Sequence, residues 1–172
     1  MADKEKADIE EIMSTDIAKA LIAEAEPRNT PSVIAAVGNN RGRTLRLYAT
    51  TSWDGSFFTP PPQSFNAGET ARFSHNGSRG ALIYGQEQGS PNAAGYLLAW
   101  SMGRNFGRRV YVNCGPLSEI HRNGWESAAL TSLNSSGVSS SATDDQTASS
   151  IRATNADATG SFPLGAVSAV LA

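Results

Sequence analysis

Hydrophobic and polar positions follow two different periods along the chain, one before Pro31 and one after it. In the first segment, apolar residues recur at intervals of three and four, which is typical of an amphipathic helix. They are Ile9, Ile12, Met13, Ile17, Ala20 and Leu21. Glu26-Pro27 ends the pattern, because a residue that precedes proline disfavours the α conformation. We therefore assign residues 1–30 to an N-terminal amphipathic helical segment, either one long helix or a broken pair capped at Asp8 or Ser14-Thr15.

After Pro31 the pattern becomes one of short apolar or alternating runs, each bounded by Gly, Asn, Ser or Pro. The predicted strands cover residues 32–37, 44–50, 70–75, 80–84, 96–101, 108–114 and 162–171. Strands of this length and spacing indicate an antiparallel β-sandwich rather than a parallel βαβ sheet. Residues 38–42 read as a hairpin turn between the first two strands, and three consecutive prolines at 60–62 predict a loop over residues 51–66.

A second helix is predicted near residues 117–135, where Leu117, Ile120, Trp125, Ala129 and Leu133 recur at roughly helical spacing. A glycine at position 124 weakens the centre of this helix and can split it. Residues 131–150 are rich in Ser and Thr and predict a loop. The predicted fold is therefore mainly β, with a sandwich domain over residues 31–172 flanked by an N-terminal helix and a late helix.

The net charge of −2 is the sum of two unlike segments. Residues 1–26 hold eight acids and three lysines, a balance of −5, whereas residues 27–172 hold eight acids and eleven arginines, a balance of +3. A sequence pI of about 5.7 argues against a nucleic-acid partner. Six arginines near predicted strand ends form either a solvated rim or a small cluster for one phosphate or carboxylate. They are Arg41, Arg43, Arg46, Arg104, Arg108 and Arg109.

Spacings that carry well-known chemistry are absent from the sequence. It contains no zinc-ligand spacing, no nucleophile elbow and no phosphate-binding loop, so we expect no enzyme activity, no metal and no cofactor. An enzyme that uses His75 or His121 with a neighbouring acid remains an alternative. The single cysteine, Cys114, falls in a predicted strand and is expected to be a buried, inert thiol. The charged start and the lack of an apolar run of about 18 residues lead us to expect a cytoplasmic protein.

Aromatic residues suggest where a ligand would bind. Trp53 lies in the predicted loop 51–66 beside Asp54, and Trp100-Ser101 ends a predicted strand. Aromatic and small polar side chains at one end of a sandwich are typical of a pocket for a sugar or a lipid headgroup. For Trp100 a core position is favoured over this role, whereas for Trp53 both readings stay open.

Several stretches, in this order and spacing, resemble the plant jasmonate-induced protein family of the 23 kDa type. The matching stretches are Asn40 with Thr44-Leu45, Ser52-Trp53-Asp54-Gly55 with Pro60 and Pro62, Gly68 with Phe73-Ser74-His75, Gly80-Ala81-Leu82-Ile83-Tyr84, Leu97-Leu98-Ala99-Trp100-Ser101, Val110-Tyr111, and Trp125 with Leu133 and Ser135-Ser136-Gly137. The resemblance covers about residues 32–140 and extends to the actinoporin-like and fungal-lectin-like β-sandwich superfamily. It implies a two-sheet sandwich flanked by two helices and an association with jasmonate and stress responses, without an established catalytic activity.

The pore-forming branch of that superfamily uses an amphipathic N-terminal helix and a tyrosine-rich phosphocholine site. By this resemblance, Ser101 stands where the strand-end serine of that site falls. However, Gly103 replaces the expected proline, and the late helix offers Trp125 in place of a tyrosine cluster. Caging of a quaternary ammonium needs several rings, and the first helix is acidic, so the sequence argues against pore formation.

We therefore predict a non-enzymatic, jasmonate- or stress-induced defence-type protein that binds a glycan or a lipid headgroup. The predicted ligand-binding residues are Trp53, Asp54, Ser101 and Trp125. No nucleic-acid partner and no stable membrane insertion are expected, and the oligomeric state stays open. The alternatives are a membrane-active, actinoporin-like cytolysin and an enzyme with an unrecognised site.

Overall fold

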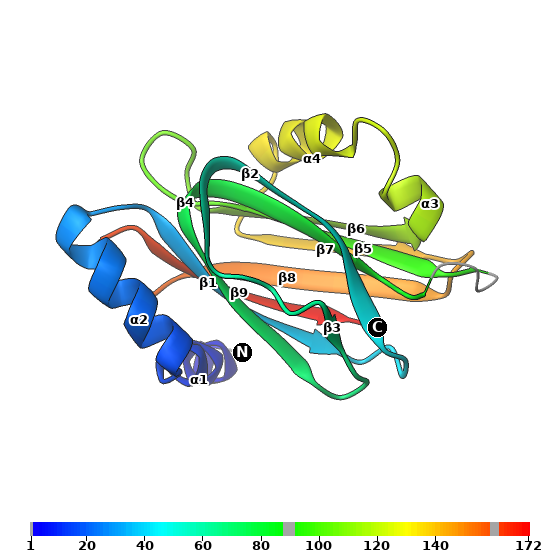
Figure 1. Cartoon of the computed structure of the whole chain (residues 1–172), viewed down its shortest axis with the longest axis horizontal. Helices are drawn as coiled ribbons and strands as arrows, with labels where there is room; N and C mark the ends of the chain where they lie inside the picture. The colour runs from blue at the N-terminus through cyan, green and yellow to red at the C-terminus, as the bar shows by residue number, and fades with distance from the viewer. Residues whose placement is uncertain (1, 88–91, 159–161) are drawn as a thin grey trace.

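Two stacked β-sheets carry helices on their outer sides (Figure 1). The computed structural model describes residues 2–87, 92–158 and 162–172. The strands are β1 (Ser32–Asn39), β2 (Leu45–Thr59), β3 (Ser64–Phe65), β4 (Thr70–Gly85), β5 (Ala94–Ser101), β6 (Arg109–Pro116), β7 (Ser139–Asp144), β8 (Ser149–Asp157) and β9 (Leu164–Leu171). The helices are α1 (Ala2–Met13), α2 (Asp16–Ala25), the 3-10 turn η1 (Glu26–Arg28), α3 (Leu117–Ile120) and α4 (Trp125–Asn134). The predicted mainly-β fold with an early and a late helical segment is confirmed.

Strand β4 belongs to both sheets. Its first half pairs antiparallel with β1, and its second half pairs antiparallel with β5. The first sheet continues from β1 to a parallel β9 and then to β8 and β7, while the second sheet continues from β5 to β6. Strand β2 follows the other edge of β4 from Ser74 to Gly85. The two sheets approach each other again at β6 and β7, where the Val112 amide donates to Ser140 Oγ at 3.1 Å.

Two glycines allow β2 and β4 to approach closely where the pairing of β4 changes sheets. Gly55 on β2 and Gly77 on β4 have φ values of +90° and +138°, a region that L side chains rarely adopt. The register between the two strands shifts between Asp54 and Ser56. A Cβ on Gly55 would overlap the carbonyl oxygen of Asn76. The bend therefore requires a residue without a side chain at this position.

The space between the sheets is filled by a continuous apolar core that contains Trp100, Phe73, Tyr84 and Tyr96, all fully buried. Trp100 is thus a core residue, as expected. The buried phenols are satisfied, since Tyr84 donates to the Pro62 carbonyl and Tyr96 to the Ala172 carbonyl, each at 2.8 Å. Burial raises the pKa of Tyr96 to about 12, so this core stays uncharged at neutral pH.

Each outer face is covered in part by helices. Helices α1 and α2 pack on the first sheet through Ile12, Leu21 and their neighbours, and α3 and α4 pack on the second sheet. The N-terminal segment is a broken pair, because Thr15 ends α1 and caps α2 by accepting the Ala18 amide. The late helix is likewise split at Gly124, whose φ is +81°.

Three local predictions were wrong, in each case because strand pairing overrides local composition. Residues 38–42 do not join a hairpin, since β1 pairs with β4 and β9 rather than with β2. Most of the expected loop 51–66 is strand, because β2 stays paired with β4 up to Thr59. The serine-rich stretch 131–150 contains the end of α4, the whole of β7 and the start of β8. In β7 the small side chains of Ser140 and Ala142 are partly buried, and the hydroxyl-bearing residues between them face solvent.

Because of the bend, replacing Gly55 with alanine should destabilise the protein more than replacing another glycine with a similar φ. Gly68 has a φ of +81° with open space where a Cβ would be, so Gly68→Ala should cost about 1 kcal/mol from conformation alone. Gly55→Ala adds a backbone overlap and should lower the free energy of unfolding by more than about 3 kcal/mol. Urea denaturation of both variants measures the difference, and equal losses would contradict this view of the bend.

Candidate functional site

The four residues predicted to bind ligand have different surroundings. Trp53 on β2 and Trp125 at the start of α4 join one apolar cluster on the outer face of the second sheet. Asp54 is exposed and accepts hydrogen bonds from the amide and hydroxyl of Ser78, which lower the pKa of its carboxyl. Ser101 is buried, and its hydroxyl donates to the Gly107 carbonyl at 2.9 Å. The structure thus places both tryptophans in one apolar cluster, whereas the side chains of Asp54 and Ser101 form hydrogen bonds within the fold.

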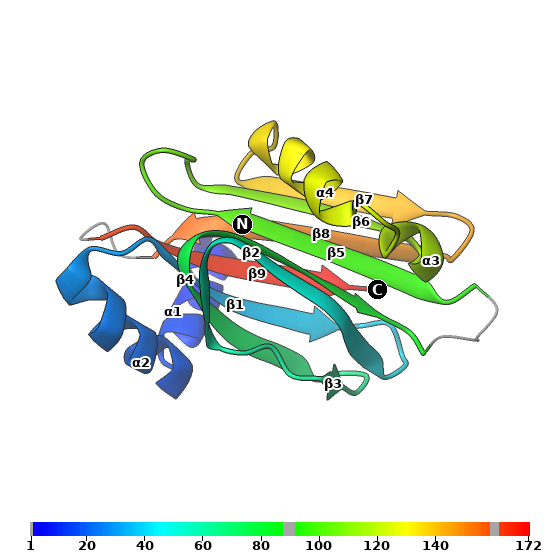
Figure 2. The ribbon, with the colours of Figure 1, turned by 45° about the horizontal axis from the view of Figure 1, so that its top comes forward.

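A cavity of about 470 Å³ lies between α3–α4 and the outer side of β6 and β7, with Trp125 in its wall. We call it the helix–sheet groove. Besides Trp125, its chemically distinctive lining residues are Tyr111, Asn113, Glu119, Arg122, Ser132 and Asp144. Its volume falls in the range of pockets that hold small ligands. Figure 2 shows α3 and α4 lying across β5 and β6, which is the arrangement that forms the groove.

The alternation of β6 and the packing of α4 position these side chains. Val110, Val112 and Cys114 face the core, so Tyr111 and Asn113 face outward toward the helices. Trp125 and Ala129 anchor α4 on Leu97 and Ala99 of β5. The groove wall opposite the helix is formed by the end of β7.

The polar lining of the groove is rich in acceptors. Asp144 Oδ2 accepts from the amide and hydroxyl of Thr147 at 2.8 and 2.6 Å, and these bonds lower the pKa of the Asp144 carboxyl. Asn113 Oδ1 accepts the Cys114 amide at 2.9 Å, which leaves the amide nitrogen as a donor. The Arg122 guanidinium has no side-chain partner among residues 2–87, 92–158 and 162–172. Together with Glu119, these groups can exchange several hydrogen bonds with a polyhydroxylated ligand.

The arginine rim expected from the sequence largely ties loops to strands. Arg41 donates to the carbonyls of Thr147 and Ala148 at 2.7 Å each and to Gln86 at 3.1 Å. Arg108 and Arg109 donate to the carbonyls of Asn155 and Ser136 at 2.6 Å each. These three guanidinium groups therefore stabilise the fold and are not free to hold an anion.

His75 is fully buried on β4, and its Nε2 lies 3.0 Å from Ser52 Oγ. Burial lowers the pKa of His75 to about 4, so the ring is neutral at pH 7. In the described part of the chain, no carboxylate bonds its other ring nitrogen, Nδ1. The pair therefore lacks the acid that orients histidine in a nucleophilic triad. His121 is exposed at the end of α3, and within the described ranges no three His, Cys, Asp or Glu side chains form a metal-binding group.

Several groove residues were missed from the sequence. Tyr111 and Asn113 could have been found, because the alternation of the predicted strand 108–114 places them on its outer side. Asp144 could not, because residues 131–150 were predicted to be a loop and its neighbours in space depend on the pairing of β7. Cys114 is buried on β6, as expected, and burial raises the pKa of its thiol.

The buried histidine predicts a dependence of stability on pH. Its pKa is about 4 in the folded state against 6.5 ordinarily, so between these values the unfolded chain takes up a proton that the folded chain excludes. The contribution of neutral His75 to the free energy of unfolding is fully present above pH 6.5. About 3 kcal/mol of that free energy is lost as the pH falls to 4. The stability advantage of the wild type over His75→Gln should shrink accordingly in urea titrations. An advantage that stays constant with pH would contradict burial of the neutral ring, and exposed His121→Gln is the control.

The fold is similar to that of solved structures. No family model matches the chain. The solved structure of the lipid binding protein Nakanori superposes with a TM-score of 0.71 at 17% identity, covering 91% of this chain and 79% of that one. The wild-type lectin of Xerocomus chrysenteron superposes with a TM-score of 0.46 at 12% identity, covering 83% of this chain and 99% of the lectin.

A curated relative extends the comparison to the sequence. A jasmonate-induced protein homolog of Atriplex canescens is 25% identical over 172 residues, which span 94% of this chain and 90% of that protein. The resemblance expected from the sequence is thus confirmed: along nearly its whole length the chain is similar to a jasmonate-induced protein, and it has the fold of Nakanori.

Proposed function

We propose that this chain is a non-enzymatic, stress-induced binding protein that holds a glycan in the helix–sheet groove. The observation that carries the proposal is the placement of two aromatic residues, Tyr111 and Trp125, in one cavity with the carboxylates of Glu119 and Asp144. A sugar ring presents an apolar face, which stacks on aromatic side chains, and a rim of hydroxyl groups, which donate hydrogen bonds to acceptors such as carboxylates. The similarity to a jasmonate-induced protein homolog supports the stress-related part of the proposal.

A zwitterionic lipid headgroup is the second candidate ligand. It is favoured by the Arg122 guanidinium, which has no partner among the described residues and lines the groove with Glu119 and Asp144, since a phosphate and an ammonium would pair with these opposite charges. Nakanori, which has the same fold, is a lipid binding protein. A choline group is bound best by a cage of several rings, however, and the described residues of the groove lining include two aromatic ones, Tyr111 and Trp125. The groove therefore favours a glycan.

Membrane activity is a further alternative, in which the N-terminal helix would be the segment that inserts into the bilayer. Within the described residues, the helices are too short or too polar to cross a bilayer. Helix α1 packs on the first sheet through Ile12, and its Glu11 pairs with Arg72 of β4 at 2.9 Å. Release of α1 would expose this face and break the ion pair, so we propose that α1 stays docked during function.

The groove can be tested by filling it. Ala128 is exposed on α4 and lines the groove, whereas its neighbour Ser127 is exposed on the same helix and is absent from the lining. Ala128→Trp should therefore weaken binding by about tenfold or more through steric exclusion, and Ser127→Trp should not. A glycan array and a panel of lipid vesicles identify the ligand, and isothermal titration then measures both variants. A blank array together with blank vesicles, or equal losses in the two variants, would refute the proposal.

The membrane-active alternative predicts a different outcome in vesicles. We expect the full chain to cause no dye release from vesicles of phosphatidylcholine and sphingomyelin, because the acidic helix is docked on the sheet. A variant that lacks residues 1–26 serves as the comparison. Leakage caused by the full chain and lost in the shortened one would establish membrane activity instead.

A further inference from the structure

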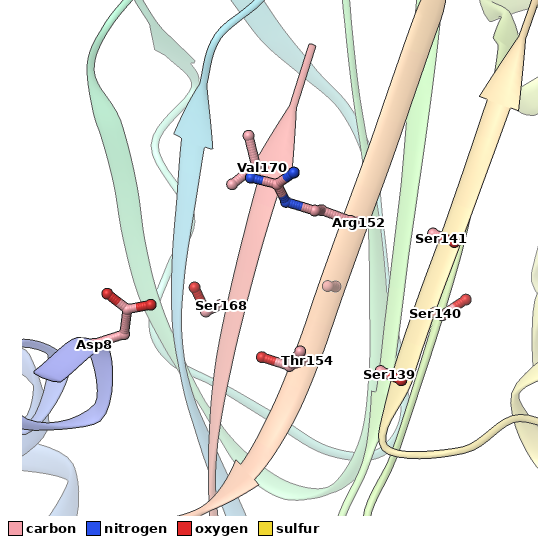
Figure 3. Close-up of a pocket in the computed structure, with 9 residues that line it drawn as sticks. Asp8, Ser139, Ser140, Ser141, Arg152, Thr154, Ser168 and Val170 are labelled. Carbon is pink, nitrogen blue, oxygen red and sulfur yellow. The ribbon is translucent and has the colours of Figure 1, made fainter. Parts of the chain in front are cut away.

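The outer face of the first sheet is only partly covered by its helices. Helix α2 packs over Ile34, Leu164 and Ala166. Beyond it, β7, β8 and β9 leave a cavity of about 450 Å³, which we call the open-face hollow, with Asp8 of α1 at one side (Figure 3). A smaller cavity of about 220 Å³ adjoins it and shares Asp8, Ser168 and Val170. Of the residues that the structure describes, none lines both the hollow and the helix–sheet groove.

Strand register arranges the hydroxyl groups of the hollow in rows. Ser139 of β7 lies opposite Thr154 of β8, and Thr154 lies opposite Ser168 of β9. In the next outward-facing row, Ser141 lies opposite Arg152. Because neighbouring strands are about 4.8 Å apart, the first row spans about 10 Å, a length comparable with a short oligosaccharide.

These polar groups are available to a ligand. In the part of the chain that the structure describes, neither the Arg152 guanidinium nor the side-chain hydroxyls of Ser139, Ser141, Thr154 and Ser168 have a hydrogen-bond or ion-pair partner. Arg72, on the same sheet, is by contrast paired with Glu11. Figure 3 shows Arg152 extending from β8 across Val170 of β9, so that its charge lies over the hollow.

We propose that the open-face hollow binds a saccharide that carries a carboxylate, such as a uronic acid unit. The Arg152 guanidinium would hold the carboxylate through two parallel hydrogen bonds, and the rows of Ser and Thr would bond the ring hydroxyls. Asp8, at the opposite side, accepts from further hydroxyls. None of the described residues that line the hollow is aromatic, so a neutral sugar would gain no stacking from them and affinity depends on the charge.

The same observations disfavour a phosphate dianion. The backbone amides of β8 are engaged with β7 on one side and β9 on the other, so the floor offers no cradle of free N–H groups. One guanidinium compensates one negative charge, and the Asp8 carboxylate repels a second charge on the same group. The hollow is therefore suited to a monoanionic group attached to a polyol.

Isothermal titration with α-1,4-linked trigalacturonate and its methyl ester tests the proposal on the full chain. The ester keeps the hydroxyl groups and removes the charge, so it should bind about tenfold more weakly or worse. Arg152→Gln should cause a similar loss for the acid, and the double variant Thr154→Val with Ser168→Ala should also weaken it. These side chains lie on the outer face of the sheet, so the variants should fold normally.

Controls separate this site from the helix–sheet groove. Arg122→Gln and Ala128→Trp alter the groove alone and should leave the affinity for trigalacturonate unchanged. The proposal would be overturned by equal binding of acid and ester, by wild-type affinity in Arg152→Gln, or by no binding to the wild type. Inorganic phosphate that binds more tightly than the acid would also overturn the assignment to a saccharide. Failure of groove binding would leave these outcomes unaffected, because none of the described residues lines both sites.

Discussion

The fold depends on a single strand that pairs in both sheets. The first half of β4 is hydrogen-bonded to β1 and its second half to β5, while β2 pairs with its other edge from Ser74 to Gly85, across the change of partner. The transition is sterically feasible because Gly55 and Gly77 let the two backbones come together without side chains. Once β4 is bent in this way, its inward residues, from Phe73 to Tyr84, contribute to one core between the sheets. The two outer faces are then left to be covered by the helices.

Incomplete coverage of those outer faces creates both candidate binding sites. Helix α4 leaves a groove beside β6 and β7, and α2 leaves the hydroxyl-rich surface of β7, β8 and β9 open. The oppositely charged segments of the chain also help to hold this fold together. The acidic N-terminal helices dock on a sheet that supplies Arg72, and several other arginines bond loop carbonyls. The two oppositely charged segments are thus in contact, with Glu11 and Arg72 forming an ion pair between α1 and the sheet.

Local periodicity predicted much of this structure, and non-local pairing accounts for what it missed. The helical spacing from Ile9 to Leu21 and the strand alternation after Pro31 both correspond to real elements. The partner of β1 could not be predicted, since β9 lies more than a hundred residues away and pairs with it in parallel. For the same reason the serine-rich β7 was taken for a loop. Trp125 was singled out from the sequence and lines the helix–sheet groove, whereas Asp144 reaches that cavity only through the pairing of β7 with β8.

If ligand binding resides in the groove between α4 and β6, the three tryptophans of the chain offer a direct readout. In a ¹H–¹⁵N spectrum each indole N–H gives one resolved signal. On titration with the glycan that binds, the signal of Trp125 should shift to saturation, while that of Trp100, which is buried between the sheets, should stay in place. Saturable binding that leaves the Trp125 signal unmoved would show that the ligand binds outside the groove.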